Sequence, residues 1–433
     1  MGRGRHPRPI QGLAVFSIRA LVAIVLSVTA TRGWSQNIVD SPDRYRKDVA
    51  GARAQPEFDP LGIPLAGMIV HPDVAIITGY NSNVFSRSQS IVSDGNVVVK
   101  PSLKADGDWQ RYALGLQAEG TLTRFFTLRE QDSDEYRVEG SGSIDLNERL
   151  SMRSSVEYAR QVEARGTSGN RLLTGEPVYF DRFAASIAGK YKSGRFAIEA
   201  VLAYRQLRYP AVQIDAETEI DQRFRDSDGI GGRLTILYAV GPAMTVLGQV
   251  VADRTENPHQ IYCCTREANG LAALGGFRFD SGGRMVGQVA LGYRRREFGD
   301  PAQRPLNGLT YDVRVEWYPR PLFTFSVTAD RKVQNSGLFR SNEALVDTQT
   351  LRVDYELLRN FLIAVSGSHE TTTYRSVSTR TNLKTVSLRA TYTPRRALQC
   401  ALFATGRFNR SNRADVASGY DGYQLGFSAK VRL

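Results

Sequence analysis

From about Met68 to Leu433 the chain repeats segments of roughly ten to fourteen residues in which apolar and polar side chains alternate. Successive side chains of a β-strand point to opposite faces, so this period of two predicts strands and not helices. Four segments show it most clearly: every second residue is uncharged, and charged residues are frequent between them. These segments are 112–122, 136–146, 309–317 and 423–433. Each predicted strand therefore has one dry face and one wet face.

A soluble β-sandwich would alternate in the same way, with its dry face turned inward. The connections favour a membrane barrel instead. The sequence contains about eighteen strand-like segments, and long connections such as 81–95 and 208–223 alternate with tight turns such as 106–108 and 319–321. Up-and-down outer-membrane barrels have this pattern. We therefore predict an all-β fold, a transmembrane up-and-down antiparallel β-barrel of about 18 strands, over residues 67–433.

The N-terminus predicts export from the cytoplasm. Three arginines within the first eight residues precede an apolar run at 20–30 that ends in small residues, as in a cleavable secretory signal peptide. The run is shorter than the roughly 20 residues of a membrane helix, so a retained anchor is the less favoured alternative. We assign 1–36 to the signal peptide and 37–66 to a polar periplasmic lead-in, which together with the barrel predicts a location in the cell outer membrane.

The chain is basic, with a formal net charge of +12. Such a balance would fit nucleic acid, anionic lipid or an acidic polymer, so the place of the charges decides between them. On the predicted strands, five arginines form a one-sided patch on the wet, lumen-facing side: Arg278, Arg284, Arg294, Arg296 and Arg314. Cross-strand ion pairs in a solvated interior are one interpretation. A basic ladder that gives the lumen a modest preference for anions is the other.

Candidates for covalent chemistry are few. His369 beside Ser366 suggests a barrel hydrolase, but His369 has the parity of the lipid-facing Phe361 and Ile363. The sequence contains no Gly-x-Ser-x-Gly motif, no phosphate-binding glycine loop and no paired-histidine metal motif. We therefore predict no enzymatic activity, no cofactor and no catalytic or metal site, and we keep an outer-membrane hydrolase as an alternative.

Adjacent cysteines, Cys263 and Cys264, occur in a long predicted loop. Three interpretations remain open: a vicinal disulfide, two free thiols, or a metal site with His259 and Glu267. The oxidising side of the envelope favours the disulfide. Cys400 is predicted to lie too far across the barrel wall to join them.

Several short motifs are similar to a known family. Asn81–Phe85 after a strand, Pro101–Leu103, Trp109–Tyr112 and Pro177–Tyr179 resemble the bacterial outer-membrane proteins called putative β-barrel porin 2, over roughly 64–433. Such proteins are often encoded beside genes for exopolysaccharide synthesis and export. The resemblance implies a porin-like barrel that serves envelope polysaccharide and has polysaccharide or its export components as partners.

We therefore predict a porin-like channel associated with exopolysaccharide secretion. A plugged structural or assembly barrel without conductance is the first alternative, and the hydrolase is the second. A secreted soluble β-protein is a third. Expected partners are outer-membrane lipid, lipopolysaccharide and the barrel-insertion machinery, with no nucleic acid.

Overall fold

The computed structural model describes residues 49–433 except 51–52, 168–173, 214–216, 218, 260–265, 301–302, 304, 339–342 and 414–417. The predicted signal peptide and the first part of the predicted lead-in, up to residue 48, lie outside the described residues.

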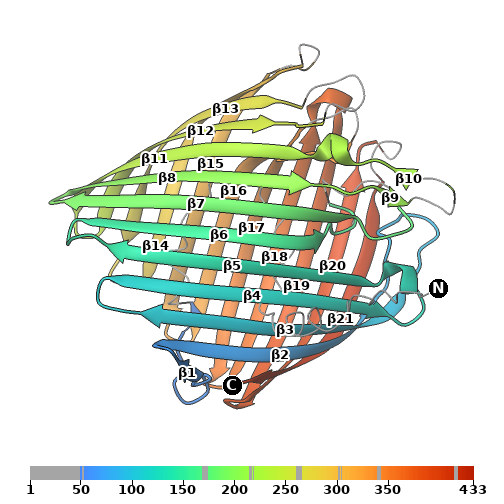
Figure 1. Ribbon diagram of the computed structural model, residues 1–433, viewed down its shortest axis with the longest axis horizontal. Helices are drawn as coiled ribbons and strands as arrows, with labels where there is room; N and C mark the ends of the chain where they lie inside the picture. The colour runs from blue at the N-terminus through green and yellow to red at the C-terminus, as the bar shows by residue number, and fades with distance from the viewer. Residues whose placement is uncertain are drawn as a thin grey trace, which may run out of the picture.

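Eighteen antiparallel strands form one closed sheet, as the alternation predicts (Figure 1). The barrel strands are β2 (Met68–Asn81), β3 (Asp94–Asp108), β4 (Tyr112–Phe125), β5 (Ser133–Asp145), β6 (Leu150–Val162), β7 (Tyr179–Ser193), β8 (Phe196–Arg208), β11 (Ser227–Gly241), β12 (Met244–Glu256), β13 (Ala268–Asp280), β14 (Met285–Phe298), β15 (Leu306–Arg320), β16 (Phe323–Asn335), β17 (Glu343–Leu358), β18 (Phe361–Tyr374), β19 (Thr379–Arg395), β20 (Leu398–Ser411) and β21 (Tyr420–Arg432). Each pairs with the next in chain order, and β21 pairs with β2, with Ile77 opposite Ser428. Closure leaves no unpaired strand edge.

Three short strands lie outside this ring. β1 (Ile63–Leu65) pairs with the beginning of β2, and β9 (Val212–Gln213) pairs with β10 (Glu219–Ile220) in the connection between β8 and β11. Three-residue 3-10 helices begin at Arg129, Arg223 and Arg375. In the described part of the chain, none of the helices has the length and apolarity needed to cross a membrane.

The dry face of each strand points away from the barrel axis. Leu116, Leu271 and Leu402 are 43%, 56% and 62% exposed in the isolated chain. A continuous exposed apolar surface of this kind is costly in water and favourable against lipid. The opposite parity lines the interior, so the sequence correctly separates the lipid face from the lumen face.

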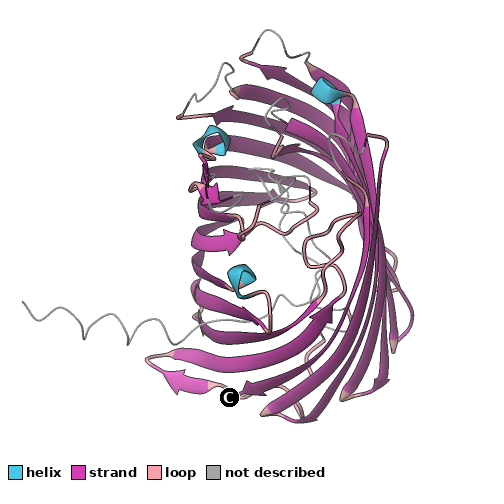
Figure 2. Cartoon of the chain, turned by 90° about the vertical axis from the view of Figure 1, so that its right-hand side faces the viewer, coloured by secondary structure: helices cyan, strands magenta, loops and turns pink. Residues whose placement is uncertain are grey.

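The two ends of the barrel differ. At the turn end, which carries the C-terminus, consecutive strands are joined by tight turns such as 281–284 (Figure 1). At the loop end, the longer connections carry the 3-10 helices and the β9–β10 hairpin, and Figure 2 looks into the barrel from this side. This arrangement is that of an up-and-down barrel.

Candidate functional site

The barrel interior is the candidate site, and the structure places the five predicted arginines unequally within it. Arg278, Arg294, Arg296 and Arg314 lie on β13, β14 and β15 with the inward parity. Arg284 does not lie on a strand. It is exposed in the tight turn before β14, and its backbone N–H donates to the carbonyl of Ser281. Arg284 thus lies just outside the strand on which the patch was predicted, because β14 begins one residue later than expected, at Met285.

Two of the inward arginines form a buried ion-pair cluster near the loop end. Arg296 donates from Nε and Nη2 to the carboxylate of Glu343, each at 2.5 Å, and from Nη1 to Asp253. Arg294 reaches the same Asp253 at 3.5 Å. Gly270 leaves the space for this contact, because a Cβ there would lie 2.6 Å from Oδ1 of Asp253. Two bases therefore meet two acids, and little net charge remains.

Arg278 and Arg314 also have acidic partners. Arg278 extends along the inner wall to Glu199 on β8, with Nη2 at 3.1 Å from the carboxylate, and Lys190 on β7 reaches the same carboxylate at 2.7 Å. Arg314 lies 3.3 Å from Asp312 two residues earlier on β15. All four inward arginines of the predicted patch thus make ion pairs. These contacts agree with the interpretation of the patch as a solvated wall held together by cross-strand pairs.

The wall formed by β16 to β20 is chemically different. Hydroxyl groups are frequent at its inward positions. We call the following residues the hydroxyl wall, of which Ser387 is buried and the others are half-buried: Ser326, Thr328, Thr350, Ser366, Ser368, Ser387 and Thr405. The strand register aligns them in rows, with Ser366 opposite Ser387 and Ser387 opposite Thr405, whose hydroxyl oxygens are 3.1 Å apart. Neutral groups that both donate and accept hydrogen bonds therefore line this side of the lumen.

Two arginines that the sequence analysis did not single out border the hydroxyl wall. Arg389 lies on β19 one row nearer the turn end, and Arg407 lies on β20 one row nearer the loop end. The Cζ atom of Arg389 lies 5.2 Å from the ring centroid of Phe403, its register neighbour. Gly426 gives that ring its room, because a Cβ at this position would lie 2.3 Å from Phe403. The signal in the sequence is the run Thr385, Ser387, Arg389, in which hydroxyls and a base share one parity.

The N-terminal segment lies against the inner rim at the turn end. The backbone N–H of Ala50 donates to the Thr324 hydroxyl at 3.0 Å, and both residues are buried. Arg53 lies 3.1 Å from Glu356, and Arg396 and Arg432 donate to backbone carbonyls of residues 56–58. We call residues 50 and 53–60 the strap. It occupies part of the turn-end mouth beneath β16–β21.

The loop end carries its own buried cluster. Val178, Phe180, Leu207, Tyr209 and Val212 pack together, and the Arg225 guanidinium lies 4.0 Å from the centroid of the Tyr209 ring. Arg225 is held by Glu163, at 2.6 and 2.8 Å from its two carboxylate oxygens. Burial raises the pKa of Tyr209 to about 12, although the nearby Arg225 acts in the opposite direction. The described parts of the β6–β7 and β8–β11 connections therefore pack against each other at the loop end.

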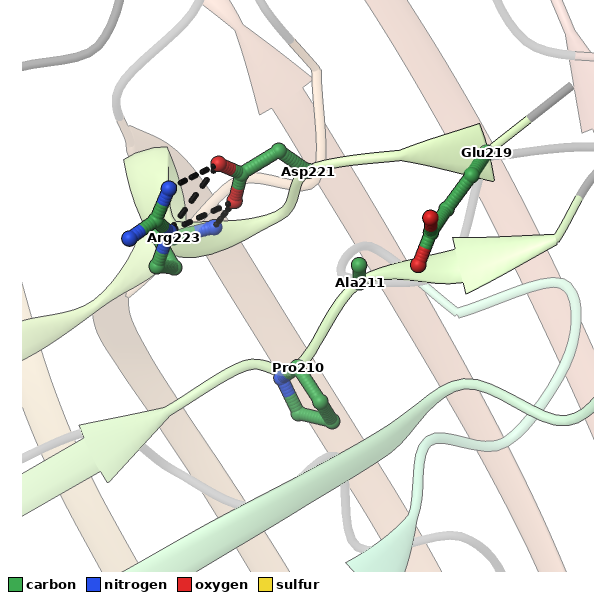
Figure 3. Close-up of a pocket in the computed structure, with 5 residues that line it drawn as sticks. All are labelled: Pro210, Ala211, Glu219, Asp221 and Arg223. Carbon is green, nitrogen blue, oxygen red and sulfur yellow. Dashed lines mark hydrogen bonds and ion pairs between the residues drawn. The ribbon is translucent and has the colours of Figure 1, made fainter.

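A shallow pocket of about 350 Å³ lies beside the β9–β10 hairpin (Figure 3). Pro210 and Ala211 form one side of it, and Glu219, Asp221 and Arg223 provide polar groups. Arg223 donates from Nε and Nη2 to the carboxylate of Asp221, at 3.0 and 2.7 Å (Figure 3). Asp221 and Arg223 are thus already paired with each other, and the pocket lies in the connection between β8 and β11.

Comparison with known proteins identifies the family. Residues 55–433 match the family described as Putative beta-barrel porin 2, which is most of the chain. The chain belongs to the putative β-barrel porin 2 family. This confirms the resemblance derived from the short motifs. A search of curated proteins found no match.

The solved structures similar to this porin-2 barrel include three of low sequence identity. The ferric enterobactin receptor of Pseudomonas aeruginosa, in a mutant complex with enterobactin, is 7% identical, with 84% of this chain and 81% of that chain covered and a TM-score of 0.47. The outer membrane protein opdK from Pseudomonas aeruginosa is 14% identical, with 84% and 99% covered and a TM-score of 0.43. The siderophore receptor PirA from Acinetobacter baumannii is 9% identical, with 84% and 80% covered and a TM-score of 0.42.

The remaining candidate residues of the porin-2 barrel do not assemble a catalytic or metal site in the described part of the chain. His369 lies on the outward face of β18, 3.2 Å from the Thr371 hydroxyl, whereas Ser366 points inward. His259 lies 3.0 Å from Asp226, and the described residues contain no group of three or more metal ligands. Cys263 and Cys264 lie outside the described residues, so their disulfide stays a prediction. Cys400 is on the outward parity of β20, opposite Tyr392.

Proposed function

We propose that this outer-membrane barrel is a porin-like channel for small polar solutes, with a modest preference for anions. The preference rests on Arg389 and Arg407, which make no ion pair with the described residues. The observation that supports the channel best is the inner face itself: all around the closed sheet, inward positions carry ion pairs and hydroxyls. Barrels of 16–18 strands are wide enough to hold an aqueous passage. A polar interior is favourable when water fills it, since unhydrated ion pairs would be costly.

The strap supports a second candidate, a structural or assembly barrel whose passage is closed. Its contacts with Thr324, Glu356 and Arg432 place protein chain at the turn-end mouth. A barrel narrowed there would conduct poorly until the strap moved. We rank this function second, because the strap contacts the strands of one wall, from β16 to β21.

The family membership supports the finer part of the proposal, an association with exopolysaccharide secretion. We propose envelope polysaccharide or its export components as partners, and we propose that the outward apolar belt contacts outer-membrane lipid and lipopolysaccharide after delivery by the insertion machinery. We propose no covalent chemistry and no binding of nucleic acid. Loss of polymer export in a deletion strain, restored by the intact chain, is the expected genetic result.

Liposome swelling tests the channel directly. Vesicles that contain the refolded full chain should swell in isotonic solutions of a small neutral sugar and should not swell in a large dextran. Swelling with neither solute would contradict the channel and favour the closed barrel. Swelling with both would indicate leaky vesicles or a misfolded protein, and the shift in gel mobility on boiling identifies the folded barrel in either case.

A further inference from the structure

The hydroxyl wall and its two bordering arginines form a feature that the channel alone does not require. A water-filled passage needs only a polar lining, and the β13–β15 wall provides one with paired charges. The hydroxyl wall instead repeats neutral donors and acceptors over five neighbouring strands. Groups of this kind can each donate and accept, so together they match a ligand that carries several hydroxyls.

The two arginines differ from those on β13–β15 in their partners. Nε and Nη2 of Arg389 are shielded from water and make no hydrogen bond with any residue that the structure describes. Nε of Arg407 is in the same state, and so is Nε of Arg294 on β14, but Arg294 has Asp253 as an ion-pair partner whereas Arg389 and Arg407 have none among the described residues. Buried polar groups in folded proteins almost always have a partner, so donors of this kind indicate a ligand or ordered water. A guanidinium presents two parallel N–H groups and binds carboxylates in bidentate fashion.

The nearby carboxylate on this wall already has another partner. The closest base on the same wall, Arg352, is held by both carboxylate oxygens of Asp354, at 2.7 and 2.6 Å. Asp354 is therefore occupied by Arg352. Phe403 supports the guanidinium of Arg389 from one side without neutralising it. The charge of Arg389 is thus positioned by an aromatic ring and has no carboxylate partner among the described residues.

The spacing also fits one small ligand. The Arg389 row and the Arg407 row are separated by four residues along the strands, or roughly 13 Å at the rise of a β-strand. The row of Ser366, Ser387 and Thr405 lies between them. A ligand with a carboxylate at one end and hydroxyls along its length would match an arginine at the border and hydroxyls beside it.

We propose that the hydroxyl wall, with Arg389 and Arg407, is a binding site for carboxylated saccharides of the uronic-acid type. The carboxylate binds the Arg389 guanidinium, and the sugar hydroxyls exchange hydrogen bonds with the serine and threonine rows. The site faces the lumen, so as a transport site it rests on the proposed channel. As a binding site it can be measured whether or not the barrel conducts.

The binding test uses the refolded full chain in detergent and titrates it calorimetrically with glucuronate, glucose and acetate. Glucuronate should bind more tightly than either of the others, because only glucuronate uses both the arginine and the hydroxyls. Acetate binding as tightly as glucuronate would overturn the saccharide assignment, and glucose binding as tightly would overturn the role of the arginines. No glucuronate binding at all would overturn the site.

Matched variants assign the binding to these residues. Arg389→Gln should weaken glucuronate binding by about tenfold or more, since a charge-assisted bidentate contact is lost. Arg389→Lys keeps the positive charge but loses the planar guanidinium. Its affinity for glucuronate should lie between that of the wild-type chain and that of Arg389→Gln. Arg153→Gln is the control, because Arg153 is an exposed residue of inward parity on β6, on a different wall. Equal binding by the wild-type chain and by Arg389→Gln, with heat-modifiable mobility retained, would overturn the assignment.

Current recordings separate this inference from the channel itself. If the barrel conducts, glucuronate should interrupt the current at concentrations at which glucose does not, and Arg389→Gln should raise the half-blocking concentration by about tenfold. Conduction without any block would overturn the site and leave the channel intact. Absence of conduction together with calorimetric binding would overturn the channel and support the site.

Discussion

Arg296 and Glu343 belong to strands that are not neighbours in the sheet, yet two hydrogen bonds of 2.5 Å join their side chains near the loop end. Their side chains are only 5% and 3% exposed. Asp253 and the Thr255 hydroxyl complete the shell around the guanidinium. The pair links β14 to β17 across β15 and β16, so it ties the wall together beyond the ladder hydrogen bonds.

Replacement of Arg296 by Gln should destabilise the barrel. The change leaves the carboxylates of Glu343 and Asp253 buried with too few partners, and breaking such a pair typically costs about 3–5 kcal/mol. Urea unfolding followed by the gel-mobility shift measures the loss. Arg295→Gln, at the preceding position of β14, is the control. Arg295 and Glu297 form an exposed outward ion pair, and such a pair should contribute less than about 1 kcal/mol to the stability of the barrel. Similar losses for both variants would contradict the assigned role.

The assignment of faces predicts different results at adjacent positions of β4. Leu116 is outward and 43% exposed, so Leu116→Arg places a charge against lipid and should cost roughly 2–4 kcal/mol. Gln117 points inward, with its amide donating to Glu119 at 2.6 Å, so Gln117→Arg should cost little. Membrane-inserted yield and unfolding in urea give both values. A larger loss for Gln117→Arg would mean that the barrel is inside out.

The buried tyrosine at the loop end predicts an alkaline transition. The pKa of Tyr209 is about 12 in the folded chain, above its ordinary value near 10, because burial disfavours the phenolate. This contribution to stability is therefore present below pH 10 and is lost as the pH rises from 10 to 12. The difference in absorbance at 295 nm between the wild-type chain and Tyr209→Phe should show one phenol that ionises near pH 12. A difference that titrates near pH 10 would mean that Tyr209 is solvated.

Release of the strap should be visible by hydrogen exchange. The side chain of Glu356 is only 8% exposed, and Glu356→Gln removes the charge that holds Arg53. Hydrogen exchange of the backbone amides in 53–60 should therefore become about tenfold faster. Arg359→Gln is the control, because its pair with Glu57 is 78% and 67% exposed and should contribute little. Equal exchange in the two variants would show that the strap is held by other contacts.

The fold could be predicted from the sequence because the pattern that encodes it is local. Alternation along each strand defines the two faces, and loop lengths define the up-and-down order, so a segment such as 112–122 identifies itself as a strand without knowledge of its contacts. Individual positions at strand ends are less certain, and Arg284 is the example. The strand begins at Met285 and not at Arg284, so Arg284 lies in the turn and not on the predicted strand.

The partners of the lumen charges could not be predicted in the same way. Arg278 reaches Glu199 across two intervening strands, and Arg296 reaches Glu343 in the same manner. Such contacts depend on the tilt and curvature of the closed sheet, which periodicity does not contain. For the same reason the clustered arginines of β13–β15 were conspicuous in the sequence although they are neutralised, whereas the solitary Arg389 was not. Charge density along a chain is a weaker guide to a binding site than the presence or absence of a partner.

Single-channel recording of the refolded full chain in a planar bilayer tests the proposed channel most directly. If the barrel is a channel, the current should change in discrete steps. Across a salt gradient, the sign of the reversal potential should indicate selectivity for anions over cations. This preference should weaken as the salt concentration rises, because the Debye length shortens from about 10 Å at 0.1 M to about 3 Å at 1 M. A folded, heat-modifiable barrel that inserts into the bilayer and never produces a current step would contradict the channel.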